Sequence, residues 1–260
     1  MSVVLRLAEI AGFLDGYLKI HEVPDEPAAV NGLQVENGSG LIERVVAAVD
    51  LSQATIDGVL GTAEPSRTLL LVHHGMFWDG NIAVTGRRYR RLRALFDHDV
   101  AVYSAHIPLD VHPEVGNNVG LARMLGCADL APFDTYKGIA IGVRGRFPEP
   151  VSRTALAARL DTMLHTKTQL IPGGPEEITT VGVITGGAGS RIGAARDAGL
   201  DAFVTGEGAH YTYFDAMEFG VNVFYSGHYA TEQVGVQALA RLLSERFGIP
   251  EAFHDHPTGL

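Results

Sequence analysis

Cysteine is nearly absent from this chain, which has a single one, Cys127, among 260 residues. One cysteine cannot form an internal disulfide, and a chain without disulfides fits a reducing compartment. No apolar run reaches the roughly 20 residues that a membrane-spanning helix needs. The first residues also lack the basic segment and apolar core of a secretion signal. We therefore expect a cytoplasmic protein that does not associate with membranes.

Positive charge is also scarce. The chain has 20 basic and 30 acidic side chains, which gives a formal net charge of -10. This excess of negative charge opposes non-specific binding to nucleic acid and to anionic membranes. Hydrophobic residues make up 46% of the chain and charged residues 19%, a balance typical of a folded protein rather than a disordered one. A chain of this length can bury a core in one large domain or in two small ones.

Short apolar runs alternate with amphipathic segments along the chain, and this alternation is typical of an α/β fold with a parallel sheet. The predicted strands are 31–38, 45–49, 69–74, 100–105, 139–143, 179–185, 202–205 and 221–225. The predicted helices are 3–19, 53–60, 86–96, 119–125, 154–164, 190–198, 211–219 and 228–247. Ser52 or Asp50 is available to cap the second helix, and a polar tail with His254 and His256 follows the last one.

Two histidines stand at the end of the predicted strand 69–74. Successive side chains of a strand point to opposite faces, so His73 and His74 converge only where the chain turns, which Gly75 permits. In open α/β sheets, the carboxyl ends of the strands are where ligands bind. The pair is therefore a candidate site, although one buried and one exposed histidine would also fit the pattern.

A second set of polar side chains follows other predicted strands. His228 and Glu232 are four residues apart at the start of a predicted helix, so both can reach one metal ion; a surface ion pair is the alternative. Asp110 follows the strand 100–105. With His73 and His74 these residues exceed the needs of one tetrahedral ion, and carboxylates can bridge two ions. The absence of thiolates favours zinc, manganese, iron or cobalt over magnesium and calcium.

Arginines dominate the predicted helix 86–96, which has five of them. A run of like charges is usually a solvated helix face. In an acidic chain, however, these side chains are the best candidates for contacting an anion. We therefore identify Arg87, Arg88 and Arg91 as candidate contacts for a substrate phosphate.

Two further features resemble functional motifs. The segment 185–193 follows a strand and opens a helix, as a dinucleotide fingerprint does. Its third glycine is wrongly spaced, and Asp201 follows too soon to contact a ribose, so we interpret the segment as a tight turn. Cys127 has no histidine near it in the sequence, and we interpret it as a small packed residue rather than a nucleophile.

In combination, five segments resemble the NIF-three-like dinuclear metal-binding proteins, often labelled GTP cyclohydrolase 1 type 2 homologues. They cover nearly the whole chain, in order: Val72–Gly75, Ser104–Asp110, Gly116–Asn118, Thr205–Glu207 and Gly227–Glu232. The resemblance implies two divalent metal ions per chain. It assigns as metal ligands His73, His74, Asp110, His228 and Glu232.

The resemblance also implies a fold of two interlocked α/β lobes with the dinuclear site in the cleft between strand ends. We expect one lobe at about 1–128 plus 226–260 and the other at about 129–225. The chain is too short for the inserted middle domain of longer relatives. The family forms toroidal hexamers, so we expect the same of this chain. One departure is the segment 28–33, which lacks the Trp and Asp that the family usually has before Gly-Leu.

Hydrolysis is the natural reaction of such a centre, because paired metal ions activate water at neutral pH. The family label implies opening of the imidazole ring of GTP with release of formate. The alternatives are hydrolysis of a phosphoester in a small nucleotide, and a ring-shaped scaffold that binds metal without catalysis. His106, Glu207 and His210 are candidates for proton transfer or for orienting the metal ligands. The expected partners are a small-molecule substrate and further copies of the chain.

Overall fold

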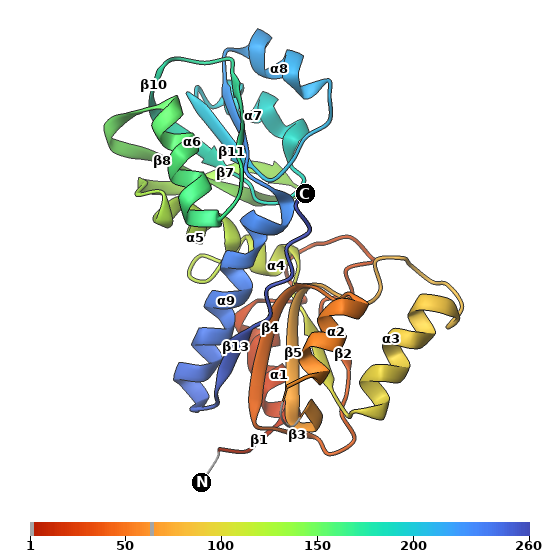
Figure 1. Cartoon of the computed structure of the whole chain (residues 1–260). Helices are drawn as coiled ribbons and strands as arrows, with labels where there is room; N and C mark the ends of the chain where they lie inside the picture. Colours follow the sequence, from red (N-terminus) through yellow and green to blue (C-terminus); the bar gives the residue numbers. More distant parts are fainter. Residues whose placement is uncertain (1–2, 63–64) are drawn as a thin grey trace. The chain divides into compact units, whose positions relative to one another are not determined.

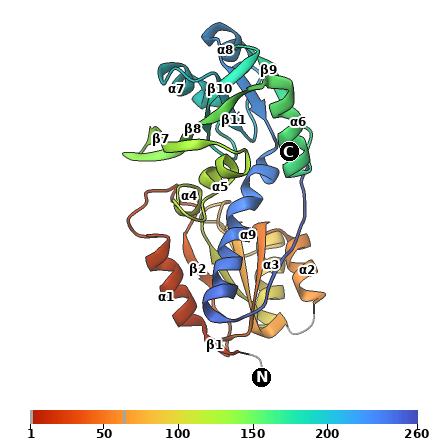
Figure 2. The same cartoon turned by 90° about the vertical axis from the view of Figure 1, so that its left-hand side faces the viewer.

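The computed structural model describes residues 3–62 and 65–260, which form an α/β protein (Figures 1 and 2). The chain divides into two compact units. The first consists of Met1–Leu109 and Gly235–His256, and the second of Asp110–Val234 and Pro257–Leu260. Among the described residues, no helix has the length and apolarity to cross a membrane.

A five-stranded sheet forms the centre of the first unit, in the order β13-β4-β5-β6-β2. Three of its four strand pairs are parallel, as the alternation of strands and helices predicts, and β2 pairs antiparallel with β6 at one edge. A short ribbon of β1 and β3 lies apart from it. The strands are β1 (Leu5–Arg6), β2 (Gly32–Val35), β3 (Leu41–Ile42), β4 (Arg44–Asp50), β5 (Thr68–His74), β6 (Ala101–Ser104) and β13 (Glu251–Phe253).

Helices cover both faces of this sheet, with α1 on one face and α2 and α3 on the other (Figure 2). Ser52 caps α2 by accepting a hydrogen bond from the Thr55 amide. The side chains of Val46, Leu70 and Val102 lie in one buried cluster with residues of α2 and α3. The helices are α1 (Leu7–Tyr17), α2 (Gln53–Leu60), the 3-10 turn η1 (Pro65–Arg67) and α3 (Gly86–Asp97). Two more helices, α4 (Ile107–Asp110) and α9 (His228–Phe247), belong to this unit only through Ile107–Leu109 and Gly235–Phe247.

The residues after α9 differ from the predicted polar tail. Glu251–Phe253 form β13, which pairs parallel with β4, and the His254 amide donates to the carbonyl of Ala47. The imidazole of His254 fills the space beside Gly58, where a Cβ would lie 2.1 Å from the ring. The sequence did not predict β13, because a strand of three residues is too short to show a hydrophobic period.

A six-stranded mixed sheet forms the second unit, in the order β7-β8-β10-β11-β12-β9. Its three central strands are parallel, as predicted, and the flanking pairs are antiparallel. The sequence did not predict β7 or β9, whose side chains are mostly exposed or half-buried. The strands are β7 (Ala128–Tyr136), β8 (Ile139–Ser152), β9 (Gln169–Pro172), β10 (Glu177–Val183), β11 (Ala202–Thr205) and β12 (Asn222–Tyr225).

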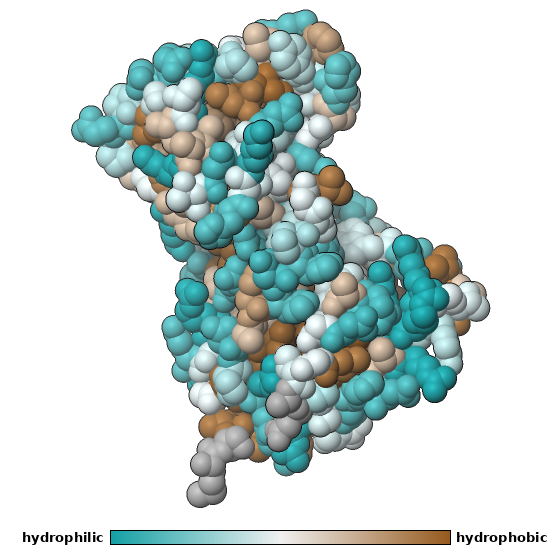
Figure 3. Space-filling view, viewed as in Figure 1, coloured by the Kyte–Doolittle hydropathy of each residue, from teal (hydrophilic) through white to brown (hydrophobic). Residues whose placement is uncertain are grey.

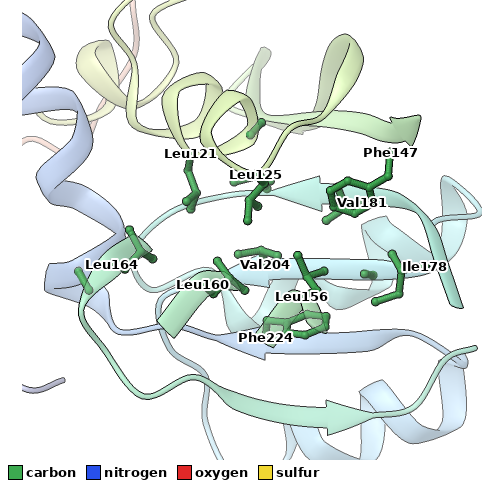
Figure 4. Packing of buried hydrophobic residues seen from close by; sticks show 14 residues of the cluster. Leu121, Leu125, Phe147, Leu156, Leu160, Leu164, Ile178, Val181, Val204 and Phe224 are labelled. Atoms are coloured by element: carbon green, nitrogen blue, oxygen red, sulfur yellow. The ribbon is translucent and has the colours of Figure 1, made fainter. Parts of the chain in front are cut away.

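Two separate clusters of buried hydrophobic residues form the core of the second unit. In the first cluster, Leu156, Leu160 and Leu164 follow the four-residue period of one helix face and pack over Val204 and Phe224 (Figure 4). The helices of this unit are α5 (Asn117–Met124), α6 (Arg153–Leu164), η2 (Gly189–Arg191), α7 (Ile192–Asp197) and α8 (Thr212–Phe219).

Residues 110–128 contain α5 and belong to the second unit, whereas the sequence assigns them to the first lobe. Leu121 and Leu125 of this segment are buried against Val181 and Phe147 (Figure 4). This packing explains why the segment belongs to the second unit. The interlocking of the two lobes stays a prediction.

Cys127 follows α5 and is half-buried. Burial raises the pKa of its thiol to about 11, against a small opposing effect of Arg159. Because the thiolate is the reactive form, Cys127 should react with iodoacetamide near pH 8 at least about tenfold more slowly than free cysteine. Mass spectrometry of the native protein would measure this rate, with the unfolded protein as control. A native rate equal to the unfolded one would contradict the expectation.

Candidate metal centre

Three imidazoles gather in the first unit where β5 and β6 end. His73 and His74 are the last residues of β5, and His106 follows β6 and precedes α4. Their candidate ligand nitrogens all lie within 4.8 Å of one another. The ring centroid of His73 lies 4.8 Å from that of His74 and 5.1 Å from that of His106. The turn after β5 therefore brings His73 and His74 together, and it adds His106 to the pair.

Each of the three rings is held through its Nδ1 atom. Nδ1 of His73 lies 2.8 Å from the Ala105 carbonyl oxygen, which can only accept a hydrogen bond. Nδ1 of His74 lies 2.8 Å from Asp50 Oδ1, and Nδ1 of His106 lies 2.8 Å from Asp25 Oδ1. In a neutral ring this arrangement places the proton on Nδ1 and the lone pair on Nε2. Metal-binding histidines are typically held by such outer acceptors.

Asp25 and Asp50 are site residues that the sequence reasoning did not identify. Asp50 ends β4 directly opposite His74 in the parallel ladder, and its place at the end of an apolar strand was a usable signal. Asp25 lies in the segment between α1 and β2 and has no such signal. Burial works to raise its pKa, but hydrogen bonds from His106 and Asn31 lower it overall. Asn31 also accepts from the His106 amide at 2.7 Å, so the segment 28–33 supports the site without the family's Trp and Asp.

Asp50→Asn should weaken metal binding about 10- to 100-fold, the usual effect of removing an outer carboxylate from a histidine ligand. The amide oxygen can still accept from His74 Nδ1 but supplies no negative charge. Competition with a fluorescent chelator would measure the affinity. Asp57→Asn is the matched control, because Asp57 is exposed on α2 and its carboxylate accepts only from Gln53 among the described hydrogen bonds. Equal affinities for both variants would show that Asp50 is not needed.

Asp110 lies at the start of the second unit, as the last residue of α4. Its Oδ1 atom accepts hydrogen bonds from Asn117 Nδ2 at 2.8 Å and from Thr185 Oγ1 at 3.2 Å. Asn118 in turn accepts from the amide and the hydroxyl of Thr185. Residues from α5 and from the segment after β10 therefore fix the orientation of this carboxylate.

His228 and Glu232 occupy the first turns of α9, with His228 Nε2 3.2 Å from Glu232 Oε2. Glu232 is only 3% exposed. Nδ1 of His228 lies 2.8 Å from Glu207 Oε1, so this imidazole also has an outer carboxylate. Burial opposes the charged ring, but Glu232 and Glu207 outweigh it and raise the pKa of His228 to about 9. A metal ion bound at His228 would therefore displace a proton.

Gly186 makes the space that the Glu232 carboxylate occupies. Its φ is +69°, and a Cβ at this position would lie 2.1 Å from Glu232 Oε1. The Gly186 amide donates to Thr231 Oγ1 at 3.0 Å. The segment 185–193 is thus a tight turn against α9, which explains Gly186 without a dinucleotide.

The remaining predicted site residues differ in whether they contact a candidate metal ligand. Glu207 contacts His228, whereas His210 is exposed and packs edge-on against Phe214. Arg87 is exposed, while Arg88 is 5% exposed and bonds to Asp79 and to two loop carbonyls. Arg91 is partly buried, and this desolvation lowers the pKa of its guanidinium.

The donors present fit divalent transition metals. The first unit offers three imidazoles, and the second offers one imidazole with the carboxylates of Asp110 and Glu232. Mixed imidazole and carboxylate ligands suit zinc, manganese, iron and cobalt. Because acceptors already hold Nδ1 of His73, His74 and His106, these rings need no reorientation to present Nε2 to an ion.

Comparison with known proteins identifies relatives over nearly the whole chain. The Duf34/NIF3 (NGG1p interacting factor 3) family model matches residues 5–256. A protein of Deinococcus radiodurans named GTP cyclohydrolase 1 type 2 homolog is 42% identical over 252 residues, which cover 97% of this chain and 94% of that protein. A protein of the same name from Pyrococcus abyssi is 43% identical over 253 residues, which cover 97% and 98%.

A solved structure from Thermus thermophilus matches the fold with a TM-score of 0.87 and 40% identity, covering 98% of this chain and all of that one. The family model and the full-length relatives agree with each other and with the predicted resemblance. The chain therefore belongs to the Duf34/NIF3 family.

Proposed function

We propose that this protein is a metal-dependent hydrolase, in which two divalent ions are bound by His73, His74, Asp110, His228 and Glu232. The observation that carries the proposal is the shared way in which the imidazoles are held. His73, His74 and His228 each have Nδ1 fixed by a carbonyl or carboxylate, so Nε2 is the ring atom that would bind a metal. Zinc, manganese, iron and cobalt are the candidate ions.

Divalent ions held by these residues would supply Lewis acidity and activate water for hydrolysis. The chain's own residues prepare the ligands for this role. Asp50 and Glu207 orient His74 and His228, and Asn117 and Thr185 orient Asp110. His106, held by Asp25, is the side chain best placed beside His73 and His74 to accept or donate a proton.

The proposed substrate is a purine nucleotide, with hydrolytic opening of its imidazole ring. The name of the relatives from Deinococcus radiodurans and Pyrococcus abyssi supports this choice. Arg87 is the best phosphate contact of the three candidates, because its side chain is 63% exposed and its only described ion pair is with Asp79 at 3.3 Å. Arg91 is partly buried, and Arg88 has its guanidinium occupied by the loop.

Mass spectrometry of the metal-loaded protein with GTP and a panel of small nucleotides tests this function. Ring opening would release formate, and phosphoester hydrolysis would release phosphate or a nucleoside. Asp110→Ala is the control for metal dependence. Turnover that is lost in this variant would support a metal-dependent hydrolase and would identify the bond that breaks. No turnover by fully loaded protein would favour a non-enzymatic metal-binding scaffold.

We also propose that the protein is a cytoplasmic homo-oligomer, in keeping with the toroidal hexamer that the resemblance implies. Exposed apolar side chains support self-association, because large apolar groups at a surface commonly mark interfaces. On and beside α8 these are Tyr211, Tyr213, Phe214 and Met217. Light scattering would measure the mass of the oligomer, and a monomer would contradict the proposal.

A further inference from the structure

The only tryptophan in the chain, Trp78, lies against two of the three imidazoles of the first unit. Its ring centroid is 4.7 Å from that of His106 at an interplanar angle of 80°, and 5.7 Å from that of His74 at 84°. Both contacts are edge-to-face. Trp78 is nevertheless 36% exposed, so part of the indole remains open to solvent beside the metal ligands.

The loop that carries Trp78 is held in place by a buried arginine. Arg88 donates to the carbonyls of Ile82 at 3.0 Å and Gly80 at 2.7 Å, and it pairs with Asp79. Its guanidinium also lies over the ring of Phe77, 5.6 Å from the centroid. The ion pair and the hydrogen bonds to main-chain oxygens offset the cost of burying this guanidinium, and they tie it to the loop. The loop is therefore built to a defined shape.

The start of this segment is fixed as well. Gln34 accepts from the Met76 amide at 2.7 Å and donates to the carbonyls of Ala29 and Val30. Gly75 has no room for a side chain, because a Cβ there would lie 2.3 Å from the Gln34 amide nitrogen. The indole thus extends from a backbone that is anchored on both sides.

Beyond Trp78 the loop exposes two more apolar side chains, Ile82 at 49% and Val84 at 56%. Figure 3 shows hydrophobic surface near the N-terminal end of α3, where this loop leads into the helix. A partly exposed indole favours flat, π-bearing partners, since base–aromatic stacking is favourable for every base. The neighbouring Arg87, which is exposed and contacts Asp79, adds positive charge for an anionic group.

We propose that Trp78 is a specificity-determining residue that stacks on the planar heteroaromatic ring of the substrate beside His74 and His106. The inference rests on the proposed function for the role of those imidazoles. It adds the residue that recognises the planar heteroaromatic ring of the proposed purine nucleotide. A second copy of the chain is the other occupant that an exposed tryptophan could have, and the experiment separates the two.

Because Trp78 is the only tryptophan, its fluorescence reports directly on this position. Titration of the metal-loaded protein with GTP and with guanosine should quench the emission in a saturable way, whereas ribose 5-phosphate should not. Calorimetry should show that Trp78→Leu binds GTP at least tenfold more weakly and that Trp78→Phe, which retains a flat ring, binds within about threefold of the wild type. Metal content and circular dichroism should be unchanged in both variants.

Equal GTP affinity in Trp78→Leu and wild type would overturn the inference, as would quenching by ribose 5-phosphate alone. A change of oligomer mass in Trp78→Leu at unchanged GTP affinity would assign the residue to contacts between copies. Turnover of GTP without tryptophan quenching would contradict this inference and leave the hydrolase intact. Quenching without turnover of any nucleotide would contradict the hydrolase and leave the stacking site intact.

Discussion

Asp110→Ala should remove at least one metal ion per chain while the protein stays folded. The substitution deletes a carboxylate ligand of the proposed centre and leaves Asn117 and Thr185 without the oxygen that they contact. Loss of such buried hydrogen bonds costs about 1–3 kcal/mol, less than the roughly 5–15 kcal/mol that typically separates folded from unfolded protein. Plasma emission spectrometry of dialysed protein would give the metal content, and thermal unfolding would confirm the fold.

Two further variants separate the causes of this loss. Asp110→Asn retains an oxygen that can accept from Asn117 and Thr185 but has no charge, so it should lose metal with a smaller loss of stability. Glu218→Ala removes an exposed carboxylate on α8 of the same unit and should keep all of its metal. Full metal content in Asp110→Ala would refute the ligand assignment.

Gly186→Ala should abolish metal binding at His228 and Glu232 and destabilise the protein by about 1–3 kcal/mol, the cost of a non-glycine residue at positive φ. The added methyl group would overlap Glu232 Oε1, at 2.1 Å, and approach His228 Nε2, at 3.4 Å. Glu232 is a flexible side chain and can move away, so we expect the fold to survive and the ligand geometry to be lost. Metal content and chemical denaturation would measure the two effects separately.

Gly199→Ala is the control for the loss of stability that comes from placing a non-glycine residue at positive φ. Gly199 has φ of +65°, and a Cβ there would have no neighbour within 4 Å. It should therefore show a similar loss of stability with full metal content. If Gly186→Ala also retained full metal content, Glu232 would not be a ligand at that position.

The sequence predicts the central strands of both units well, because each is an apolar run bounded by turn residues. The run Leu69–Val72 and the segment Ala202–Thr205 correspond to β5 and β11. Strands whose side chains are partly exposed gave a weaker signal, which is why β7 was missed and β8 is longer than predicted. In such strands the pairing with a neighbour, rather than the hydrophobic pattern, determines the structure.

The sequence indicated candidate site residues where side chains that can bind metal stand at the end of a predicted strand or on one face of a predicted helix. His73 and His74 end a strand, and His228 and Glu232 share one helix face, so local periodicity places them. Asp25 contacts His106 from a loop 81 residues away, and no local pattern indicates such a contact. The role of Gly186 was also hidden, because its glycine requirement comes from Glu232, which lies far along the chain.

The position of β13 has a practical consequence for handling the protein. β4 is buried over five consecutive residues, Val45–Val49, and β13 is the strand that pairs with its outer side. Cleavage after Pro250 would uncover a row of unpaired backbone amides and carbonyls on a strongly hydrophobic strand. Open edges of this kind recruit strands from other molecules. Proteolytic clipping of the residues after Pro250 should therefore increase aggregation of the protein.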